Sequence, residues 1–214
     1  MVYFVRHGES EGNTSPVFMD DAVPLTAVGR AQAEAVAMRC TKLPVEVIVA
    51  STMPRAIETA EIINAKIGKP MAYSDLFVER RRPSDLLGKD KKHPDTVAVQ
   101  KAMRHGFGHI AGYRFSDEED FAELKARAYA ALDYLAGMTE ENILVATHGW
   151  FMRIMVACAV FGAELTDREC KRFVDAFAPT NTGITVFTYD EKRVADGNTG
   201  PWRILTWNDH AHLG

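Results

Sequence analysis

The chain has 214 residues, of which 47% are hydrophobic and 25% charged, and its formal net charge is −4 at pH 7. This balance is typical of a globular domain with a sizeable core, and the acidic net charge argues against a general nucleic-acid binder. The three cysteines, Cys40, Cys158 and Cys170, are too few and too widely spaced for a disulfide framework or a CxxC metal motif, which indicates a reducing compartment.

The chain opens with an apolar run over residues 2–5, which predicts a buried strand. No basic leader precedes this run and it is too short for the apolar core of a signal peptide, so we expect no secretory signal. No apolar stretch reaches the roughly 20 residues that a membrane-spanning helix needs. We therefore expect a cytoplasmic protein that does not bind a membrane.

Four more apolar runs predict strands, over residues 45–50, 143–146, 184–188 and 204–207. Helices are predicted from Thr26 to about Arg39, from Pro54 onward, after capping boxes at Ser116-x-x-Glu119 and Thr166-x-x-Glu169, and from Gly149 to about Phe161. Long helical patterns separate the first three strands, which favours βαβ units and a largely parallel sheet. The residues therefore predict an α/β fold.

The segment 80–115 differs from the rest of the chain in charge and regularity. Between Arg80 and Arg114 there are nine Lys or Arg residues against three Asp or Glu, whereas 116–141 holds eight acids and two bases. A basic island in an acidic protein attracts anions locally, although an ordinary solvated surface segment would have the same composition. We predict one domain over 1–214, with 80–115 as an irregular basic insertion over one edge of the sheet.

Polar residues follow three of the predicted strands where each strand ends. The first strand runs into Arg6-His7-Gly8, the second into Ser51-x-x-x-Arg55, and the third into Thr147-His148-Gly149. If these strands are parallel, their ends meet at the carboxyl edge of the sheet, where open α/β folds bind ligands. Helix N-termini at that edge offer unpaired N–H groups and a partial positive charge. We therefore expect an anion site there.

These residue types suit phosphoryl transfer, which needs positioning and charge neutralisation around phosphorus. Arg6 and Arg55 match phosphate oxygens with planar guanidinium forks. Of the two imidazoles, His7 and His148, one can attack as the neutral base while the other, protonated, stabilises the equatorial oxygens. Asn13 can donate from its amide. No cluster of aspartates indicates a divalent ion, and the other five histidines show no ligand spacing, so we expect no metal.

Taken together, these segments resemble the histidine phosphatase superfamily, the phosphoglycerate mutase-like group, over nearly the whole chain. The resemblance is carried by Arg6-His7-Gly8 with the following Asn13, Leu25-Thr26-x-x-Gly29-x-x-Gln32-Ala33, Ser51-x-x-x-Arg55 with Thr59-Ala60, and Thr147-His148-Gly149. Asn181-Thr182-Gly183 and Asn208-Asp209 also fit. The resemblance implies a three-layer α/β/α fold with a small insertion over the active site.

The resemblance also implies roles for matching residues. His7 would be the nucleophile, and Arg6, Arg55 and His148 would form the phosphate pocket. Asn13 and the backbone of Gly149 would be supporting donors, and Ser10 and Arg80 complete the set of candidate substrate-binding residues.

A general acid must protonate the leaving oxygen, and burial would have to raise its pKa toward neutrality. The family's acid lies after the Arg55 helix, where Glu79 is the matching residue. The alternative is that Glu79 is exposed and forms a salt bridge with one of Arg80, Arg81 or Arg82. Glu9 is a competing carboxylate, but beside the phosphate-binding residues it would repel substrate, so we interpret it as a structural partner.

After Glu79 the chain departs from the mutases of the family, which have Arg-x-Tyr-Gly where this sequence has Arg80-Arg81-Arg82-Pro83. The departure favours a phosphatase that hydrolyses a small phosphomonoester through a phosphohistidine on His7, without a metal or other cofactor. The basic insertion suggests a substrate with a second anionic group. The alternatives are a mutase-type isomerase that needs a bisphosphorylated primer, a protein phosphohistidine phosphatase, and a non-catalytic phosphate-binding module. The oligomeric state stays open.

Overall fold

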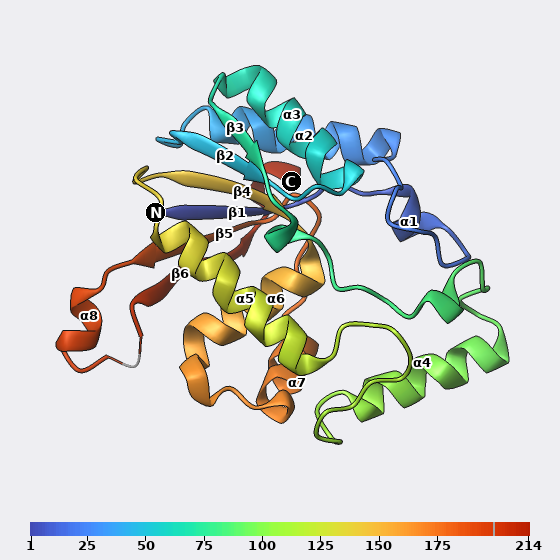
Figure 1. Cartoon of the computed structure of the whole chain (residues 1–214). Helices are drawn as coiled ribbons and strands as arrows, with labels where there is room; N and C mark the ends of the chain where they lie inside the picture. Colours follow the sequence, from blue (N-terminus) through green and yellow to red (C-terminus); the bar gives the residue numbers. More distant parts are fainter. Residues whose placement is uncertain (199) are drawn as a thin grey trace.

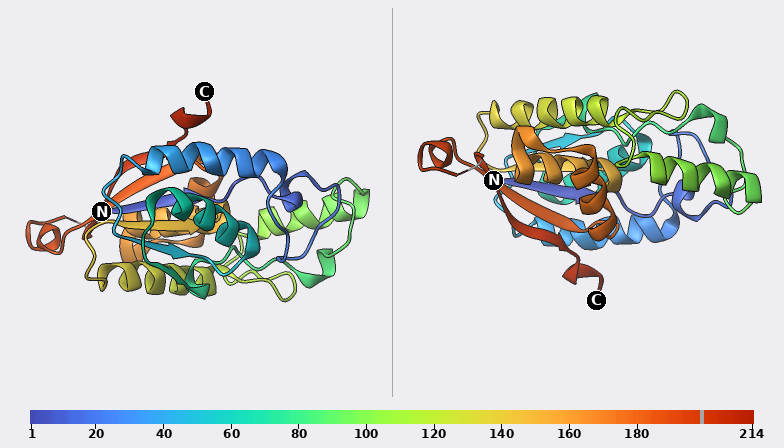
Figure 2. Two further views of the ribbon diagram at one scale, coloured as in Figure 1. Left: turned by 90° about the horizontal axis from the view of Figure 1, so that it is seen from above. Right: turned by 90° about the horizontal axis from the view of Figure 1, so that it is seen from below.

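The computed structural model of the protein describes residues 1–198 and 200–214. Its sheet contains strands β1 Val2–Arg6, β2 Val47–Ala50, β3 Met71–Tyr73, β4 Ile143–Thr147, β5 Ile184–Tyr189 and β6 Trp202–Asp209. The longer helices are α2 Ala27–Cys40, α3 Pro54–Ile67, α4 Pro94–Gly106, α5 Phe121–Ala136, α6 Gly149–Phe161 and α7 Asp167–Ala176, and the four-residue helices are α1 Glu11–Thr14 and α8 Lys192–Ala195. Helices α2 and α3 cover one face of the sheet and α5, α6 and α7 the other, which is the predicted three-layer arrangement (Figure 1 and Figure 2).

The strands lie in the order β3-β2-β4-β1-β5-β6, and neighbouring strands are parallel except where β5 takes part. The prediction of a largely parallel sheet is therefore confirmed. In the pairing of β1 with β4, Arg6 lies opposite Thr147, so His7 and His148 leave the sheet side by side. Strand β2 flanks β4 and ends at the same edge.

Strand β1 is buried on both of its faces. Alternate side chains of a strand point to opposite sides of the sheet, so Phe4 packs with the layer of α5 and α6 while Val5 packs with the layer of α2 and α3. Burial on both sides requires apolar residues at every position, which is why this strand is a continuous hydrophobic run in the sequence. Helix α6 is likewise buried along most of its length.

The predicted strands are all present, with ends within two residues of the expected positions. The predicted helices at Thr26, Pro54, Gly149 and Thr166 are also confirmed, including the capping box of Thr166, and Thr26 is the N-cap of its helix as well. The edge strand β3 was not predicted, because three residues are too few to reveal a period. In the described part of the chain, no helix is both long and apolar enough to cross a membrane.

One predicted capping box is wrong. Helix α5 begins at Phe121, and its capping box consists of Asp120 and Glu123 rather than Ser116 and Glu119. The Ser116 hydroxyl donates to Asp85 instead. The acids before the helix have other partners, which is why the helix starts four residues later than the Ser-x-x-Glu pattern indicates.

The segment 80–115 is more regular than predicted, because it contains helix α4, which lies apart from the helical layers (Figure 1). The segment is tied to the loop after β1. The ammonium group of Lys91 donates to the carbonyls of Gly12 (2.9 Å) and Ser15 (2.7 Å). The backbone N–H of Phe18 donates to the carbonyl of Lys89 at 2.9 Å. The insertion therefore packs beside the carboxyl edge of the sheet.

Helix α2 packs against the loop after β1 at two glycines. A Cβ atom on Gly29 would lie 1.9 Å from the carbonyl oxygen of Glu9, and one on Gly8 would lie 2.3 Å from the carbonyl oxygen of Gly29. The Glu9 carboxylate accepts the hydroxyl of Thr26 at 2.7 Å, so Glu9 is a structural partner, as predicted. This contact explains why Gly29 stands in the Leu-Thr-x-x-Gly motif.

We expect Gly29→Ala to destabilise the protein although alanine is the better helix former. Overpacking of this kind costs about 1–3 kcal/mol, and here the obstacle is backbone, which cannot rotate away. The measurement is the free energy of unfolding by urea. Gly137→Ala is the matched control, because its added Cβ would meet nothing closer than 3.5 Å, and we expect a change below about 0.5 kcal/mol. Equal stability of the two variants would contradict the close approach.

Candidate active site

The backbone around His7 is held from three directions. Its N–H donates to the carbonyl of Thr147 at 2.9 Å, which continues the ladder between β1 and β4. Its carbonyl accepts the side-chain amide of Asn181 at 2.8 Å. The next N–H, of Gly8, donates to the Thr59 hydroxyl on α3 at 3.1 Å. The imidazole therefore projects from a fixed point at the carboxyl edge of the sheet.

The ring of His7 has a defined tautomer. Its Nδ1 lies 2.6 Å from the carbonyl oxygen of Gly8, and a carbonyl only accepts, so Nδ1 carries the hydrogen and Nε2 keeps a lone pair. Burial lowers the pKa of His7 well below its ordinary value, and the nearby His148 and Arg55 lower it further. The group is thus a neutral base, the form a nucleophile requires.

His148 lies behind His7, with the ring centroids 5.1 Å apart. Its Nε2 is 2.8 Å from the Ser51 hydroxyl, while Nδ1 is buried without a hydrogen-bond partner among the described residues. Burial, followed by the charges of Arg55 and Arg6, lowers the pKa of His148 well below its usual range. One imidazole was expected to be protonated, but without an anion both are neutral, because two arginines oppose the added charge.

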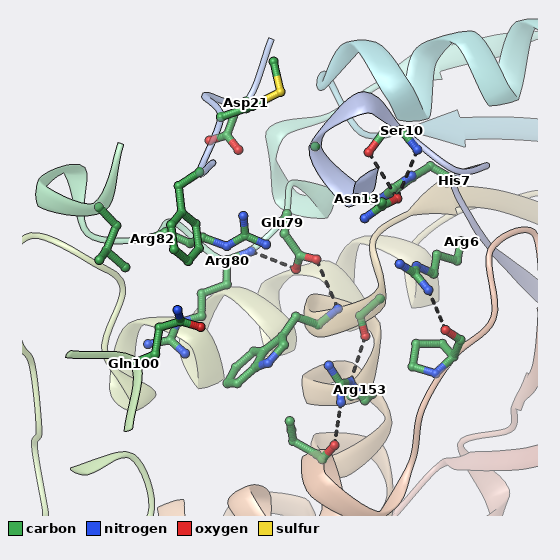
Figure 3. Close-up of a pocket in the computed structure, with 18 of the residues that line it drawn as sticks. Arg6, His7, Ser10, Asn13, Asp21, Glu79, Arg80, Arg82, Gln100 and Arg153 are labelled. Carbon is green, nitrogen blue, oxygen red and sulfur yellow. Dashed lines mark hydrogen bonds between the residues drawn. The ribbon is translucent and has the colours of Figure 1, made fainter. Parts of the chain in front are cut away.

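Arg6 and Arg55 line a cavity of about 520 Å³. His7 also lines it and is labelled with Arg6 in Figure 3. Arg6 donates from Nη1 to the carbonyl of Pro179 at 2.5 Å, and its Nε is buried without a partner within the described chain. Arg55, at the second position of α3, donates to the carbonyl of Asp21 at 3.1 Å. Burial lowers the pKa of both guanidinium groups. Each therefore has donor capacity left for an anion.

Glu79 lies in the same cavity, where its carboxylate accepts hydrogen bonds from the N-terminus of α6 (Figure 3). The backbone N–H groups of Trp150 (3.2 Å), Phe151 (2.9 Å) and Arg80 (3.0 Å) donate to it. No ion pair forms between Glu79 and an arginine in the described residues, so the alternative of an exposed, salt-bridged glutamate is wrong.

The electrostatics of Glu79 differ from expectation. Burial by itself raises its pKa, but the Arg80 N–H, the charge of Arg82 and the Trp150 N–H together outweigh burial, so the pKa lies below the ordinary value. The N–H of Arg80 lowers the pKa most, and the N-terminus of α6 adds to this through the N–H of Trp150, because a helix N-terminus favours a carboxylate. Glu79 is therefore ionised in the free protein, and a raised pKa requires an anion beside it.

The remaining predicted residues surround His7. Ser10 donates from its N–H (3.0 Å) and its hydroxyl (3.2 Å) to the side-chain oxygen of Asn13, which leaves the Asn13 amide nitrogen for another acceptor. Both residues line the cavity. Gly149 also lines it, and a Cβ there would lie 2.9 Å from Nε of Arg6, so the close approach of α6 to Arg6 needs glycine.

The wall of the cavity beyond Glu79 is basic. The arginines that line the cavity are Arg6, Arg55, Arg80, Arg82, Arg104 and Arg153, and the acids are Asp20, Asp21, Glu79 and Asp175. Arg80 lies over the ring of Trp150, with 4.6 Å from Cζ to the centroid. Of the other basic residues of the insertion, Lys91 binds backbone carbonyls and Arg81 faces Glu123. Only part of the basic island therefore faces the cavity.

Sequence reasoning missed Arg153 and Trp150. Arg153 donates from Nε to the carbonyl of Gly149 at 3.0 Å, one turn earlier on α6, and its Nη1 binds carbonyls near α7. Its position four residues after Gly149 on a predicted helix is the signal that would have placed it on the same face. In the described residues, no group of three or more His, Cys, Asp or Glu gathers as a metal site.

A model of the histidine phosphatase superfamily (branch 1) matches residues 2–209. The chain belongs to this superfamily. Phosphoglycerate mutase-like protein 4 of Arabidopsis thaliana is 30% identical to it over 220 residues, 99% of this chain and 86% of that protein. Among solved structures, Bacillus stearothermophilus YhfR has a TM-score of 0.79 at 21% identity, covering 100% of this chain and 98% of that one. A mycobacterial glucosyl-3-phosphoglycerate phosphatase complexed with VO3 has a TM-score of 0.77 at 20% identity, covering 97% and 98%.

These likenesses confirm the family and the fold that the motifs predicted. The superfamily match spans every segment that contributes to the cavity, from the first strand to the last. The two solved structures share the arrangement of elements at low identity, so they support the fold and do not identify the substrate.

The buried neutral imidazoles should make stability fall as the pH is lowered. Below about 6.5 the unfolded chain binds a proton at His7 and at His148 that the folded protein excludes, so unfolding becomes easier by up to about 1.4 kcal/mol per pH unit for each group. Urea unfolding between about pH 7 and pH 5 measures this slope. His148→Gln should show a shallower slope than the unchanged protein, and parallel slopes would contradict the assignment.

Proposed function

We propose that the protein is a phosphatase that hydrolyses small phosphomonoesters through a phosphohistidine on His7, without a metal ion. The observation that carries the proposal is the lone pair of His7 Nε2, fixed by the bond from Nδ1 to the Gly8 carbonyl, in a cavity that also holds Arg6 and Arg55. Superfamily membership and a phosphatase among the solved relatives agree with it.

In the first step, the phosphate of the substrate lies against Arg6, Arg55 and the amide of Asn13. Nε2 of His7 attacks phosphorus, so a P–N bond forms while the P–O bond to the leaving alcohol breaks. The protonated carboxyl of Glu79 gives its proton to the leaving oxygen. His148, behind His7, stabilises the negative charge on the equatorial oxygens of the phosphoryl group.

In the second step, the Glu79 carboxylate takes a proton from a water molecule whose oxygen attacks phosphorus. The P–N bond breaks, inorganic phosphate leaves, and Glu79 is again protonated, so the cycle balances. The proton for the first step arrives with the substrate, because the second pKa of a phosphate ester is about 6 and part of the substrate binds as the monoanion. A phosphate dianion beside Glu79 would also raise the pKa of its carboxyl.

With EDTA present, the protein should hydrolyse p-nitrophenyl phosphate, and His7→Ala should lower kcat at least 100-fold, because His7 is the only imidazole among the described residues that line the cavity. His105→Ala removes an imidazole outside the cavity and serves as the matched control, with activity unchanged. Activity that survives in His7→Ala would sink the mechanism.

The basic wall supports a second element of the proposal, a substrate with a second anionic group. Arg80 has no carboxylate partner within ion-pair distance in the described chain, and its buried Nε has no hydrogen-bond partner there. A desolvated guanidinium with no ion-pair partner in contact favours an incoming carboxylate or phosphate, although Glu118, Glu79 and Glu119 lie near enough to raise its pKa. Arg82 and Arg104 add positive charge along the same wall.

The pair 3-phosphoglycerate and glycerol 3-phosphate, which differ by a carboxylate in place of a hydroxymethyl group, tests this. We expect kcat/KM to favour 3-phosphoglycerate about tenfold or more, since a charge-assisted contact is worth about 1.4 kcal/mol or more. Arg80→Gln should remove the preference, whereas Arg81→Gln, whose charge faces Glu123, should keep it. Equal losses of kcat/KM on both substrates in Arg80→Gln would contradict a second anionic group on the substrate.

A mutase-type isomerase is the second candidate, because the name of the Arabidopsis thaliana relative points to it. Incubation with 3-phosphoglycerate and 2,3-bisphosphoglycerate distinguishes the two functions, since an isomerase gives 2-phosphoglycerate and a phosphatase gives inorganic phosphate. A non-catalytic phosphate-binding module would give neither product while still binding inorganic phosphate.

A further inference from the structure

The segment before Glu79 has a row of backbone carbonyls that no strand pairs. After β3 the chain forms a short 3₁₀ turn over Asp75–Phe77 and then extends. Arg127 Nη1, from α5, donates to the carbonyls of Leu76 (3.2 Å) and Val78 (2.8 Å). The Thr147 hydroxyl donates to the carbonyl between them, of Phe77, at 2.8 Å. Buried carbonyls need partners, so these two side chains replace a missing strand.

The segment after Glu79 is held by the same arginine through Glu119. Nε and Nη2 of Arg127 each lie 2.8 Å from one oxygen of the Glu119 carboxylate, in a two-pronged pair with side chains only 15% and 11% exposed. The same carboxylate accepts the N–H of Arg81 at 2.8 Å, and the Glu119 N–H donates to the Arg81 carbonyl at 3.3 Å. The backbone is thus fixed on both sides of Glu79.

The third contact of the guanidinium reaches the helix that caps Glu79. Cζ of Arg127 lies 3.8 Å from the ring centroid of Phe151, and the N–H of Phe151 is the closest donor to the Glu79 carboxylate. One guanidinium therefore contacts the chain before Glu79, the chain after it through Glu119, and the first turn of α6. Its hydrogen bonds go to Leu76, Val78 and Glu119, and none goes to Glu79.

We propose that Arg127, oriented by Glu119, is the positioning residue that aims the Glu79 carboxylate at the leaving oxygen. This inference rests on the proposed function, because it takes Glu79 as the proton donor. The planar fork of arginine binds the two carbonyls and both carboxylate oxygens at once, which the single ammonium of lysine cannot do. Small displacements of a reacting group lower the reaction rate steeply. Weakening the contacts of Arg127 and Glu119 should therefore impair proton transfer before it impairs folding.

Two substrates with different leaving groups distinguish a positioning role of Arg127 from a purely structural one. The leaving oxygen of glycerol 3-phosphate needs a proton, whereas p-nitrophenolate leaves readily without one. We expect Arg127→Lys and Glu119→Gln to lower kcat/KM, which reports the steps up to phosphoryl transfer onto His7, about tenfold or more on glycerol 3-phosphate and less than about threefold on p-nitrophenyl phosphate. Glu79→Gln should show the same selectivity to a greater degree. Arg114→Lys, which alters an exposed cluster with Asp120 and Glu123, is the matched control and should match the unchanged protein on both substrates.

A second readout does not need activity. In protein labelled with ¹³C at glutamate carboxyls, the Glu79 signal is identified by its loss in Glu79→Gln. Its pKa should rise in Arg127→Lys and Glu119→Gln, because a displaced carboxylate loses N–H donors while burial remains, and Arg55 and Arg82 are unaltered.

An unchanged Glu79 pKa together with equal losses of kcat/KM on both substrates would overturn the positioning role. An inactive unchanged protein would overturn the proposed function instead, and the shift of the Glu79 signal would still decide whether Arg127 positions this carboxylate.

Discussion

Strands β1 and β4 lie side by side in parallel, and the groups of the candidate site are placed relative to that pair. Their register sets two histidines at one edge, and the ladder continues one residue beyond the strands, through the N–H of His7. Helix α6 starts directly after the second histidine, so its unpaired N–H groups face the same space. A slip of one residue in this pairing would turn the side chains of β1 to the opposite faces of the sheet and dissolve the site.

A second constraint is the charge that this edge concentrates. Burial, together with the charges of two nearby guanidinium groups, keeps both imidazoles neutral, and the N-terminus of α6 adds further positive potential. Glu79 supplies a compensating carboxylate, and the same donors that hold it also keep it ionised. The free site is therefore arranged to receive negative charge. Its protonation states depend on whether an anion is present, which is why they differ from those that a filled site requires.

Much of this arrangement could be predicted from the sequence, because its strong signals are local. Continuous apolar runs marked the buried strands, and Arg6-His7 and His148-Gly149 followed them directly. The signals failed where local patterns competed. Ser116-x-x-Glu119 matched a capping box, but Asp120 and Glu123 cap α5. Helix α4 lies within a segment whose glycines and charges suggested irregular structure.

Long-range contacts left no local pattern at all. Arg127 is 49 residues from Val78 in sequence, and nothing near either residue indicates that they meet. The lowered pKa of Glu79 depends on the N–H of Arg80, on the charge of Arg82 and on the N–H of Trp150 from α6, and no sequence pattern shows that these groups surround its carboxylate. Sequence reasoning therefore located the candidate reacting groups more completely than the residues that hold them.

The contacts of Lys91 have a consequence for how this scaffold can change during evolution. Its ammonium group joins the insertion to the loop that carries Asn13, and Phe18 pairs with Lys89 beside it. Two walls of the cavity are thus fastened together, although more than 70 residues separate them in the chain. A new substrate size cannot be reached by lengthening one wall alone without breaking this fastening. We therefore expect a change in the size of this cavity to need matched replacements in both segments.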